Sequence, residues 1–450
     1  MGSSLVNSIF SSGTGLDVNA TVDQILNAER APERLMQSQQ SVLNIQTSLL
    51  NNLNGNLVTL KDKINALKDV SGAINAKSAT SSQTGILTAT ADNTAVAAVH
   101  TVTVTNLATT ATQYSDAFAT ADTTFGTGTF SVQVGSGTPT VVTVDSSNNT
   151  LNKLVAYING KGLGVTASIM SDANGARLLL TSKTSGAPGD ITFSANTTGL
   201  TMTEGVNGVN ASLTVDGVPV SGSSNVVNSA IPGVTLNLTS GAPATPVVVT
   251  VGSDTAKVRQ AVDDFVSAYN AVISAINTQF TYDQTSKSAG PLAGDSSLRV
   301  IQSNLLQDAT YSISGNNGFV NLESLGIEMQ NDGTLTVNDT TLNDVLGNHF
   351  TDFQNFFQGL SPTGFAYNFS TDLIGLTDST NGPVNVDLKN IKSTQDMLTQ
   401  SIQDFEDRMA LRQQLLINQY SQIDALLRTF PTTMSQIEAE LGTVNQNQTK

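Results

Sequence analysis

The sequence predicts an α+β multidomain protein in which helices from the two ends of the chain form an antiparallel stalk, with β-rich head domains inserted between them. Its 450 residues are too many for one hydrophobic core. Apolar residues recur every three or four positions near both ends, whereas the middle of the chain alternates as strands do. Apolar stripes this long are unstable in water, so the two terminal stripes are expected to cover each other.

The N-terminal stripe runs from Val42 to Leu67, and the C-terminal stripe lies in a helix expected over residues 391–441. Polar and charged residues fill the positions between the apolar ones, which is typical of a solvated helix face. The residues expected to pack in the stalk are Ile45, Leu49, Leu53, Leu57, Leu60, Ile64, Ile402, Phe405, Met409 and Leu416.

Local signals set the expected ends of these helices. Thr21 and Gln24 have the spacing of a capping box, so a helix is expected to begin there. Pro32 is expected to interrupt that helix and Pro431 to kink the last one, because proline has no amide hydrogen to donate. The polar tail from Gly442 is expected to be disordered.

The apolar period changes to the strand repeat at about Ser78, and short β-branched segments follow as far as about Gly252. Helices are expected over 151–159, 258–280, 296–306 and 342–357, a hairpin over 326–337 and a loop over 362–387. The expected domains are flexible terminal segments (1–40 and 420–450), a helical stalk (41–77 and 253–419), a β-rich head domain (78–124 and 208–252) and an outer β/α module (125–207).

Composition excludes several classes of partner. The formal charge of −16 argues against nucleic acid or anionic lipid as a partner, since both require clustered positive charge. No apolar run is long enough for membrane insertion. There is no cysteine, so neither a disulfide framework nor a thiolate metal site exists. With no Lys or Arg before Arg30, a cleaved signal peptide is not expected, and the chain is either cytoplasmic or exported with its N-terminus intact.

Catalytic chemistry is poorly supported, and no enzyme activity or cofactor is expected. The two histidines, His100 and His349, lie in a strand pattern and beside a phenylalanine, without the partners that a catalytic base needs. The segment around Ser296 resembles the nucleophile block of some serine hydrolases, but Asp344 and His349 lie in the wrong local arrangement for a triad. We expect Asp295 or Ser296 to cap a helix instead.

A partial calcium-loop pattern occupies residues 328–339. Glu328 stands where the loop requires aspartate, and Asp339 stands where it requires a bidentate glutamate. Asn331-Asp332-Gly333 between alternating apolar residues is better explained as a β-turn. No metal site is therefore expected.

Two surfaces remain as candidates for partner binding. The outermost terminal segments have no obvious partner within the fold, so they either complete an ordinary helical bundle or become ordered on binding. Between Asp216 and Asp254 the chain has no ionisable side chain, and a neutral, threonine-rich β surface suits contact with proteins or glycans.

Several segments, in their order along the chain, resemble one known family. They are Gly15-Leu16-Asp17 with residues 22–32, VTVTNLA at 102–108, FVSAYNA at 265–271, GPLAGDSSLR at 290–299, residues 325–335, and YSQIDALL at 420–427. They are similar to the family of flagellar hook-associated protein 2, the filament cap of bacterial flagella. Tyr157-Ile158-Asn159 also resembles an Ile-Asn motif of flagellins and related hook proteins, which suggests a separate outer module.

The resemblance implies a structural protein at the flagellum tip, exported extracellularly by the flagellar type III route without signal cleavage. It implies a homo-oligomeric ring that retains flagellin and promotes its folding and insertion, with the hook-filament junction protein and an export chaperone as further partners. Residues proposed to contact flagellin or the filament are Leu426, Leu427, Phe430, Leu16, Ile25 and Leu26. Ordinary stalk packing is the competing explanation for these residues. Val226 and Val227 are the candidates for self-association.

An alternative function is that of a surface adhesin whose β-rich head binds host mucin or glycans. A head that faces outward could perform both roles, so the two readings are not exclusive.

Overall fold

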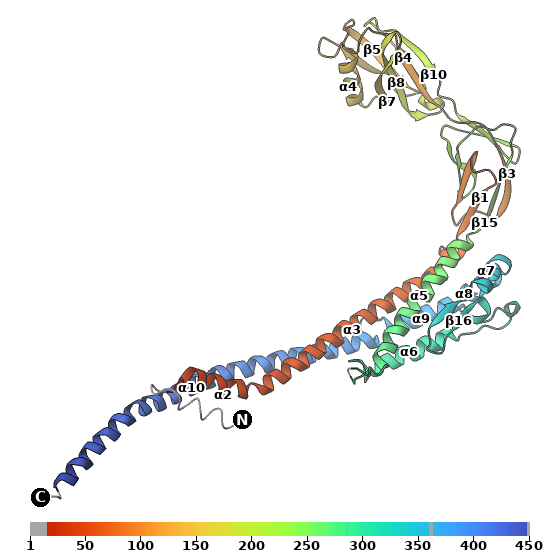
Figure 1. Cartoon of the computed structure of the whole chain (residues 1–450). Helices are drawn as coiled ribbons and strands as arrows, with labels where there is room; N and C mark the ends of the chain where they lie inside the picture. The colour runs from red at the N-terminus through yellow and green to blue at the C-terminus, as the bar shows by residue number, and fades with distance from the viewer. Residues whose placement is uncertain (1–15, 286, 360–362, 448–450) are drawn as a thin grey trace. The chain divides into compact units, whose positions relative to one another are not determined.

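The computed structural model describes residues 16–285, 287–359 and 363–447. The chain forms two compact units, one from residues 1–68 with 262–450 and the other from residues 69–261 (Figure 1). The first unit is mainly helical and combines segments from both ends of the chain, whereas the second consists mainly of β-sheet. The predicted α+β multidomain class with helical termini is confirmed.

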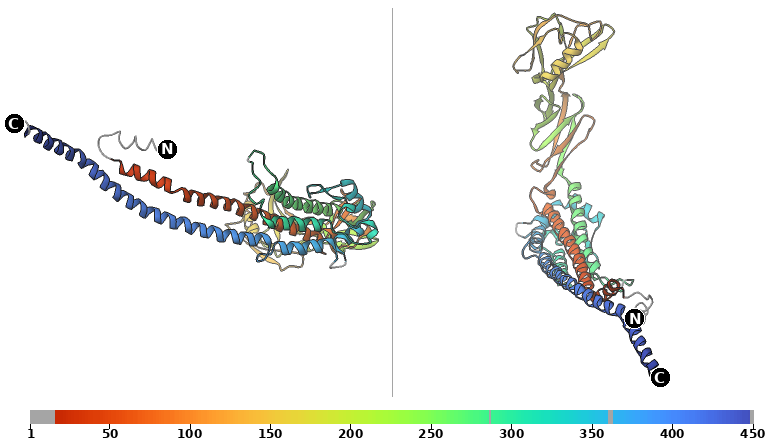
Figure 2. Two further views of the ribbon diagram at one scale, coloured as in Figure 1. Left: turned by 90° about the horizontal axis from the view of Figure 1, so that it is seen from below. Right: turned by 90° about the vertical axis from the view of Figure 1, so that its left-hand side faces the viewer.

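Helices α2 (Val18–Glu29) and α3 (Ala31–Lys68) run antiparallel to α10 (Pro383–Asn447) and lie beside it in Figures 1 and 2. Side-chain hydrogen bonds join Gln395 to Asn44 at 2.8 Å and Gln40 to Thr399 at 3.0 Å. N-terminal residue numbers thus rise as their C-terminal partners' numbers fall, as in the predicted hairpin of the two chain ends.

The helix boundaries correct three expectations. Helix α2 begins at Val18 and not at Thr21, because the Asp17 carboxylate accepts a hydrogen bond from the amide of Ala20 and provides the cap. The interruption near Pro32 falls at Arg30, and Pro32 lies in the first turn of α3, where its missing amide hydrogen is not needed. Helix α10 continues through Pro431 to Asn447, so the residues immediately after Gly442 are helical.

The rest of the helical unit packs against one end of α3. Its elements are α5 (Thr255–Phe280), α6 (Ser296–Ala309), β16 (Ile327–Met329), β17 (Leu335–Val337), α7 (Asp339–Asn348), α8 (Phe350–Gln358) and α9 (Phe365–Leu376). The expected hairpin is present as β16 and β17, and the helix expected over 342–357 is two helices. The loop expected over 362–387 is wrong, because α9 lies within it. Phe365 and Phe369 of α9 are buried against the ring of Phe265 from α5, which explains why this segment is helical.

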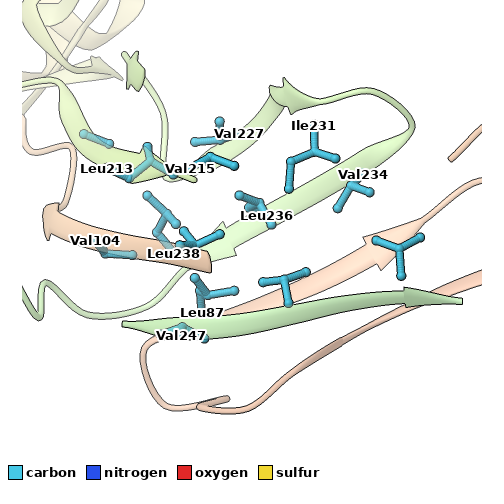
Figure 3. Close-up of a cluster of buried hydrophobic side chains, with 14 of the residues drawn as sticks. Leu87, Val104, Leu213, Val215, Val227, Ile231, Val234, Leu236, Leu238 and Val247 are labelled. Atoms are coloured by element: carbon cyan, nitrogen blue, oxygen red, sulfur yellow. The ribbon is translucent and has the colours of Figure 1, made fainter. Parts of the chain in front are cut away.

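The inner head domain is a pair of packed antiparallel sheets. Its strands are β1 (Lys77–Ser81), β2 (Leu87–Ala91), β3 (Ala98–Asn106), β11 (Ala211–Val215), β12 (Val218–Gly222), β13 (Val226–Ile231), β14 (Val234–Leu238) and β15 (Val247–Ser253). One sheet has the order β1-β15-β3-β11-β12 and the other β13-β14-β2. Inward-facing aliphatic side chains such as Leu213, Leu236 and Val247 fill the core between them (Figure 3).

The outer module contains two further sheets and one helix. Its elements are β4 (Thr110–Ser115), β5 (Gly128–Val134), β6 (Thr140–Val144), α4 (Leu151–Lys161), β7 (Val165–Asp172), β8 (Gly175–Ser185), β9 (Ile191–Ser194) and β10 (Met202–Val206). The sheets have the orders β10-β4-β8-β7 and β6-β5-β9, and α4 packs on β7. Because β4 pairs with β8 and β10, residues 110–115 belong to this module, whereas the expected boundary stood at residue 125.

Asparagine side chains complete three strands or loops by pairing with main-chain groups. In each case the side-chain amide donates to a carbonyl oxygen, and the amide oxygen accepts from the N–H of the same residue. The pairs are Asn159 with Ala167 (2.8 Å and 2.8 Å), Asn225 with Ala108 (3.0 Å and 2.7 Å) and Asn270 with Leu335 (2.7 Å and 2.7 Å). These side chains supply hydrogen bonds that a neighbouring strand would otherwise provide.

Candidate functional site

The candidate site is the apolar face of the C-terminal helix, α10. One part of this face is covered by α2: Met409 and Leu416 are only 6% and 4% exposed and pack in one cluster with Val22 and Leu26. An ion pair also joins the two helices in this region: the Arg412 guanidinium donates to the Glu29 carboxylate at 3.1 Å. Here the stripe behaves as the sequence predicts for a stalk.

Beyond Tyr420, which is still partly buried against this cluster, the apolar face of α10 is exposed among the described residues. At 3.6 residues per turn, or about 100° per residue, its apolar positions all point within about 60° of the direction of Leu416. We call this set the distal stripe; it consists of Ile423, Leu427, Phe430, Met434, Ile437 and Leu441. Their exposed fractions range from 38% at Ile423 to 64% at Phe430. Such a continuous apolar surface is typical of a binding site.

The cover ends at Asp424. Its carboxylate accepts a hydrogen bond from the main-chain amide of Leu16 at 2.8 Å and another from the Arg428 guanidinium at 2.8 Å. Leu16 is the first described residue, so the described part of the N-terminus reaches α10 just where the distal stripe begins.

The six residues predicted to contact flagellin or the filament differ in their exposure. Leu426, Leu427 and Phe430 are exposed, although Leu426 points about 80° away from the direction of Leu416 and so lies beside the distal stripe. Leu16 and Ile25 are half-buried. Leu26 is buried between α2 and α10, so its role in this chain is helix packing, and its assignment as a contact residue requires α2 to move.

The predicted stalk residues also differ in how deeply they are buried. Of the ten, six are buried: Leu53, Leu57, Leu60, Ile64, Met409 and Leu416. Leu49, Ile402 and Phe405 are half-buried. Ile45 is 48% exposed, so its assignment to the stalk core is wrong. Leu67, the last residue of the predicted N-terminal stripe, is buried. Leu50 is also buried and was missed, although the alternating steps of three and four from Leu50 through Leu67 are the regular coiled-coil repeat.

The two self-association candidates on β13 face opposite ways. Val226 is 53% exposed, whereas Val227 is 4% exposed and packs in the core of the inner head (Figure 3). Side chains alternate between the two faces of a strand, so only one of two consecutive valines can be on the surface. The assignment of Val227 to a contact surface is therefore wrong, while that of Val226 stays a prediction.

The groups that were considered for catalysis are engaged in local structure. His100 Nδ1 lies 2.7 Å from an Asp216 carboxylate oxygen at a strand end, and Asp344 accepts a hydrogen bond from Asn348 and not from His349. Asp295 caps α6 by accepting from the amide of Ser297, as predicted.

The calcium-like segment is a turn. The Asp332 carboxylate accepts hydrogen bonds from the amide and hydroxyl of Thr334, and β16 and β17 pair on either side. Across the described ranges, no group of three or more His, Cys, Asp or Glu side chains is arranged to hold a metal ion. Within the same ranges, no helix is both long and apolar enough to span a membrane.

Comparisons with known proteins match both ends and the middle of the chain. The family model described as flagellar hook-associated protein 2 C-terminus matches residues 208–430, and the corresponding N-terminus model matches residues 14–111. The model described as flagellin hook IN motif matches residues 129–184. This last match contains Asn159 of the Ile-Asn motif, whose side chain holds strand β7 through Ala167.

Individual relatives extend over most of the chain. The B-type flagellar hook-associated protein 2 of Pseudomonas aeruginosa is 30% identical over 409 residues, covering 81% of this chain and 84% of that protein. Flagellar hook-associated protein 2 of Escherichia coli K12 is 28% identical over 455 residues, covering 94% and 95%. The crystal structure of the D1-D2-D3 domains of the flagellar cap protein FliD from Escherichia coli aligns with a TM-score of 0.59 and 26% identity, covering 78% of this chain and 99% of that one. The chain belongs to the flagellar hook-associated protein 2 family.

Proposed function

We propose that this structural, non-catalytic flagellar cap protein assembles with copies of itself into a ring at the tip of the filament. There it retains exported flagellin and promotes its folding and insertion into the growing filament. The flagellar type III route would deliver it outside the cell with its N-terminus intact, assisted by an export chaperone, and it would sit first on the hook-filament junction protein. None of the comparisons favours the adhesin alternative.

The observation that carries this proposal is the apolar surface at the end of α10. A family of filament-tip proteins must contact the filament through some part of each subunit, and here exposed leucine side chains and the exposed ring of Phe430 gather on one terminal helix. Leu426, Leu427 and Phe430 lie on the part of this helix that the described N-terminal residues leave uncovered. Large apolar side chains dominate binding energy when they become buried in an interface.

Ring formation requires a second surface, because head-to-tail rings use two different patches on each subunit. The inner head offers exposed, uncharged β surface, including Val226. Burial of such a surface in a subunit contact would carry no penalty for desolvating charges.

The test is complementation of a strain that lacks this protein, with the ratio of polymerised filament to flagellin monomer in the medium as the measurement. The full-length chain is expected to restore filaments, while the empty strain secretes monomer from hooks without filaments. Leu426→Asp is expected to lower the ratio, and Thr432→Asp, on the opposite side of α10, serves as the matched control. Normal filaments in the empty strain would refute the cap role.

A further inference from the structure

Strand β7 is an edge strand of the outer module. It lies at the end of the order β10-β4-β8-β7 and pairs only with β8 (Figure 1). The amide of Lys183 donates to the carbonyl of Gly164 at 2.9 Å, in register with the pairs of these two strands. Hydrogen-bonded and non-bonded pairs alternate along an antiparallel ladder, so every second residue of β7 points its N–H and carbonyl away from β8. These outward residues are Val165, Ala167, Ile169 and Ser171.

The side chain of Asn159 occupies the middle of this open edge. Its amide group makes two hydrogen bonds of 2.8 Å, one with the N–H and one with the carbonyl of Ala167. A residue of a further strand would make the same two bonds. Within the described ranges, the outward main-chain groups of Ile169 and Ser171 form no hydrogen bond. Asn159 therefore closes one position of the edge and leaves its neighbours open.

Strand β7 has the features of an edge that pairs readily with another chain. Its eight residues make it the longest edge strand of the described sheets. It has no proline, glycine or charged residue before Asp172, and Met170 is 42% exposed. Prolines, charges, bulges and short length are what usually protect an edge. Other edge strands are shorter, and they include β12, which contains Pro219, and β10, whose register shifts between Glu204 and Val206.

A second copy of this chain has the matching edge, because two β7 strands present the same pattern of groups. Antiparallel pairing about a two-fold axis at Ser168 puts Ala167 of each copy opposite Ile169 of the other. Val165 then lies opposite Ser171, so all outward groups of both strands would be bonded. Once Ala167 is occupied, the central bonds of this pairing cannot form. The continuous run that stays open is three residues long, from Ile169 to Ser171, which is too short for a stable strand pair.

We infer that Asn159 guards the edge of β7 and prevents it from pairing with the β7 edge of a second copy. The asparagine of the Ile-Asn motif then does more than hold its own strand in place. It restricts association between copies of this chain to other surfaces. This inference concerns a contact that the chain avoids, so it holds or fails separately from the proposed function.

The test compares Asn159→Ala with the matched control Asn152→Ala in the full-length chain. Asn152 lies on the same helix, but its side chain donates to the Asp122 carboxylate and not to a strand edge. By light scattering at equal concentration, Asn159→Ala is expected to have about double the wild-type mass, as for a two-fold dimer. Asn152→Ala is expected to have the wild-type mass. A wild-type mass for Asn159→Ala, or an equal rise for Asn152→Ala, overturns the inference.

Unfolding of the outer module would also raise the mass, and a second substitution separates the two causes. Ser171 is exposed and its N–H points to the open edge, so Ser171→Pro removes an edge donor without breaking a bond to β8. The double variant Asn159→Ala with Ser171→Pro is expected to return to the wild-type mass. A mass that stays high in the double variant assigns the association to unfolding and refutes the inference.

The absence of cysteine allows the geometry of the contact to be tested as well. Pairing about Ser168 brings this exposed residue opposite its copy, with the two Cβ atoms about 4.5–5.5 Å apart. Under mild oxidation, Ser168→Cys is expected to give disulfide-linked dimers in the Asn159→Ala background and monomers when Asn159 is intact. Dimers that form equally in both backgrounds, or in neither, contradict the inference.

Discussion

Replacing Asn270 by leucine is expected to destabilise the helical unit strongly, although the side chain is polar and only partly buried. Asn270 projects from α5 and makes both hydrogen bonds to Leu335 of β17, each 2.7 Å long. Strand β17 pairs with β16 on one edge only, so on the other edge the N–H and carbonyl of Leu335 depend on this one side chain. Leucine has a similar volume but satisfies neither group.

The magnitude follows from the two main-chain groups left behind. A buried polar group without a partner costs about 1–3 kcal/mol. Because Leu335 is only 1% exposed, water cannot readily replace the lost partner. With two such groups, the free energy of unfolding should therefore fall by about 2–6 kcal/mol. Asn277→Leu is the matched control. This residue lies on the same helix; its amide donates an exposed bond to the Asp332 carbonyl and accepts one from the Gln302 side chain, so its loss leaves no buried main-chain group without a partner and should cost about 1 kcal/mol.

The measurement is urea unfolding followed by circular dichroism at 222 nm, which is dominated by the helical unit. With a denaturant slope of about 3 kcal/mol per molar, Asn270→Leu should move the midpoint of that transition down by roughly 1 M, and Asn277→Leu by a few tenths at most. Equal midpoint shifts in the two variants would show that the two hydrogen bonds between Asn270 and Leu335 stabilise the fold no more than an exposed bond does, and would refute the reasoning.

Three further changes have defined outcomes. Burial and the neighbouring Asp372 carboxyl raise the pKa of Asp308 to about 8, so the folded state retains a proton that the unfolded state loses near pH 4. The Tm should therefore fall between about pH 4 and 8 and then level off. The variant Asp308→Asn should flatten this pH dependence of Tm. Val227→Asp should unfold the inner head, whereas Val226→Asp should keep the wild-type Tm and impair only self-association measured by light scattering. Pro431→Ala should restore a helical amide and slow hydrogen exchange after residue 431, by up to about 3 kcal/mol in local stability, and unchanged exchange would contradict this.

The apolar repeat predicted the long stalk helices well and the shorter elements poorly. Leu53, Leu57, Leu60 and Ile64 were identified because a buried helix face repeats every three or four residues. Ile45 has the same spacing but is exposed. The repeat identifies the apolar face of a helix, but it does not show along which part of that face other elements pack. The helix over Phe365–Leu376 was missed because it is short and bounded by glycine and threonine, which favoured a loop.

The contacts that close the fold could not be predicted at all. The bond from Asn270 to Leu335 links residues 65 positions apart, and a single asparagine has no periodic signal. Likewise, the sequence Val226-Val227 does not reveal which valine is inside, because the register of β13 depends on its pairing with β14. The recognisable family motifs contain Asn159 and Asn270, yet only the structure shows that each acts by pairing with a main-chain N–H and carbonyl.

The distal stripe raises the same problem on a larger scale. An isolated helix is only marginally stable in water, and Pro431 weakens this one further, so the end of α10 needs an apolar cover to be well ordered. If a bound flagellin provides that cover, its binding free energy is reduced by the free-energy cost of ordering the helix. The affinity is then lower than the buried apolar area alone would give. Such a contact would be specific yet weak enough to be exchanged, as the proposed function requires of a subunit that yields to each newly inserted flagellin.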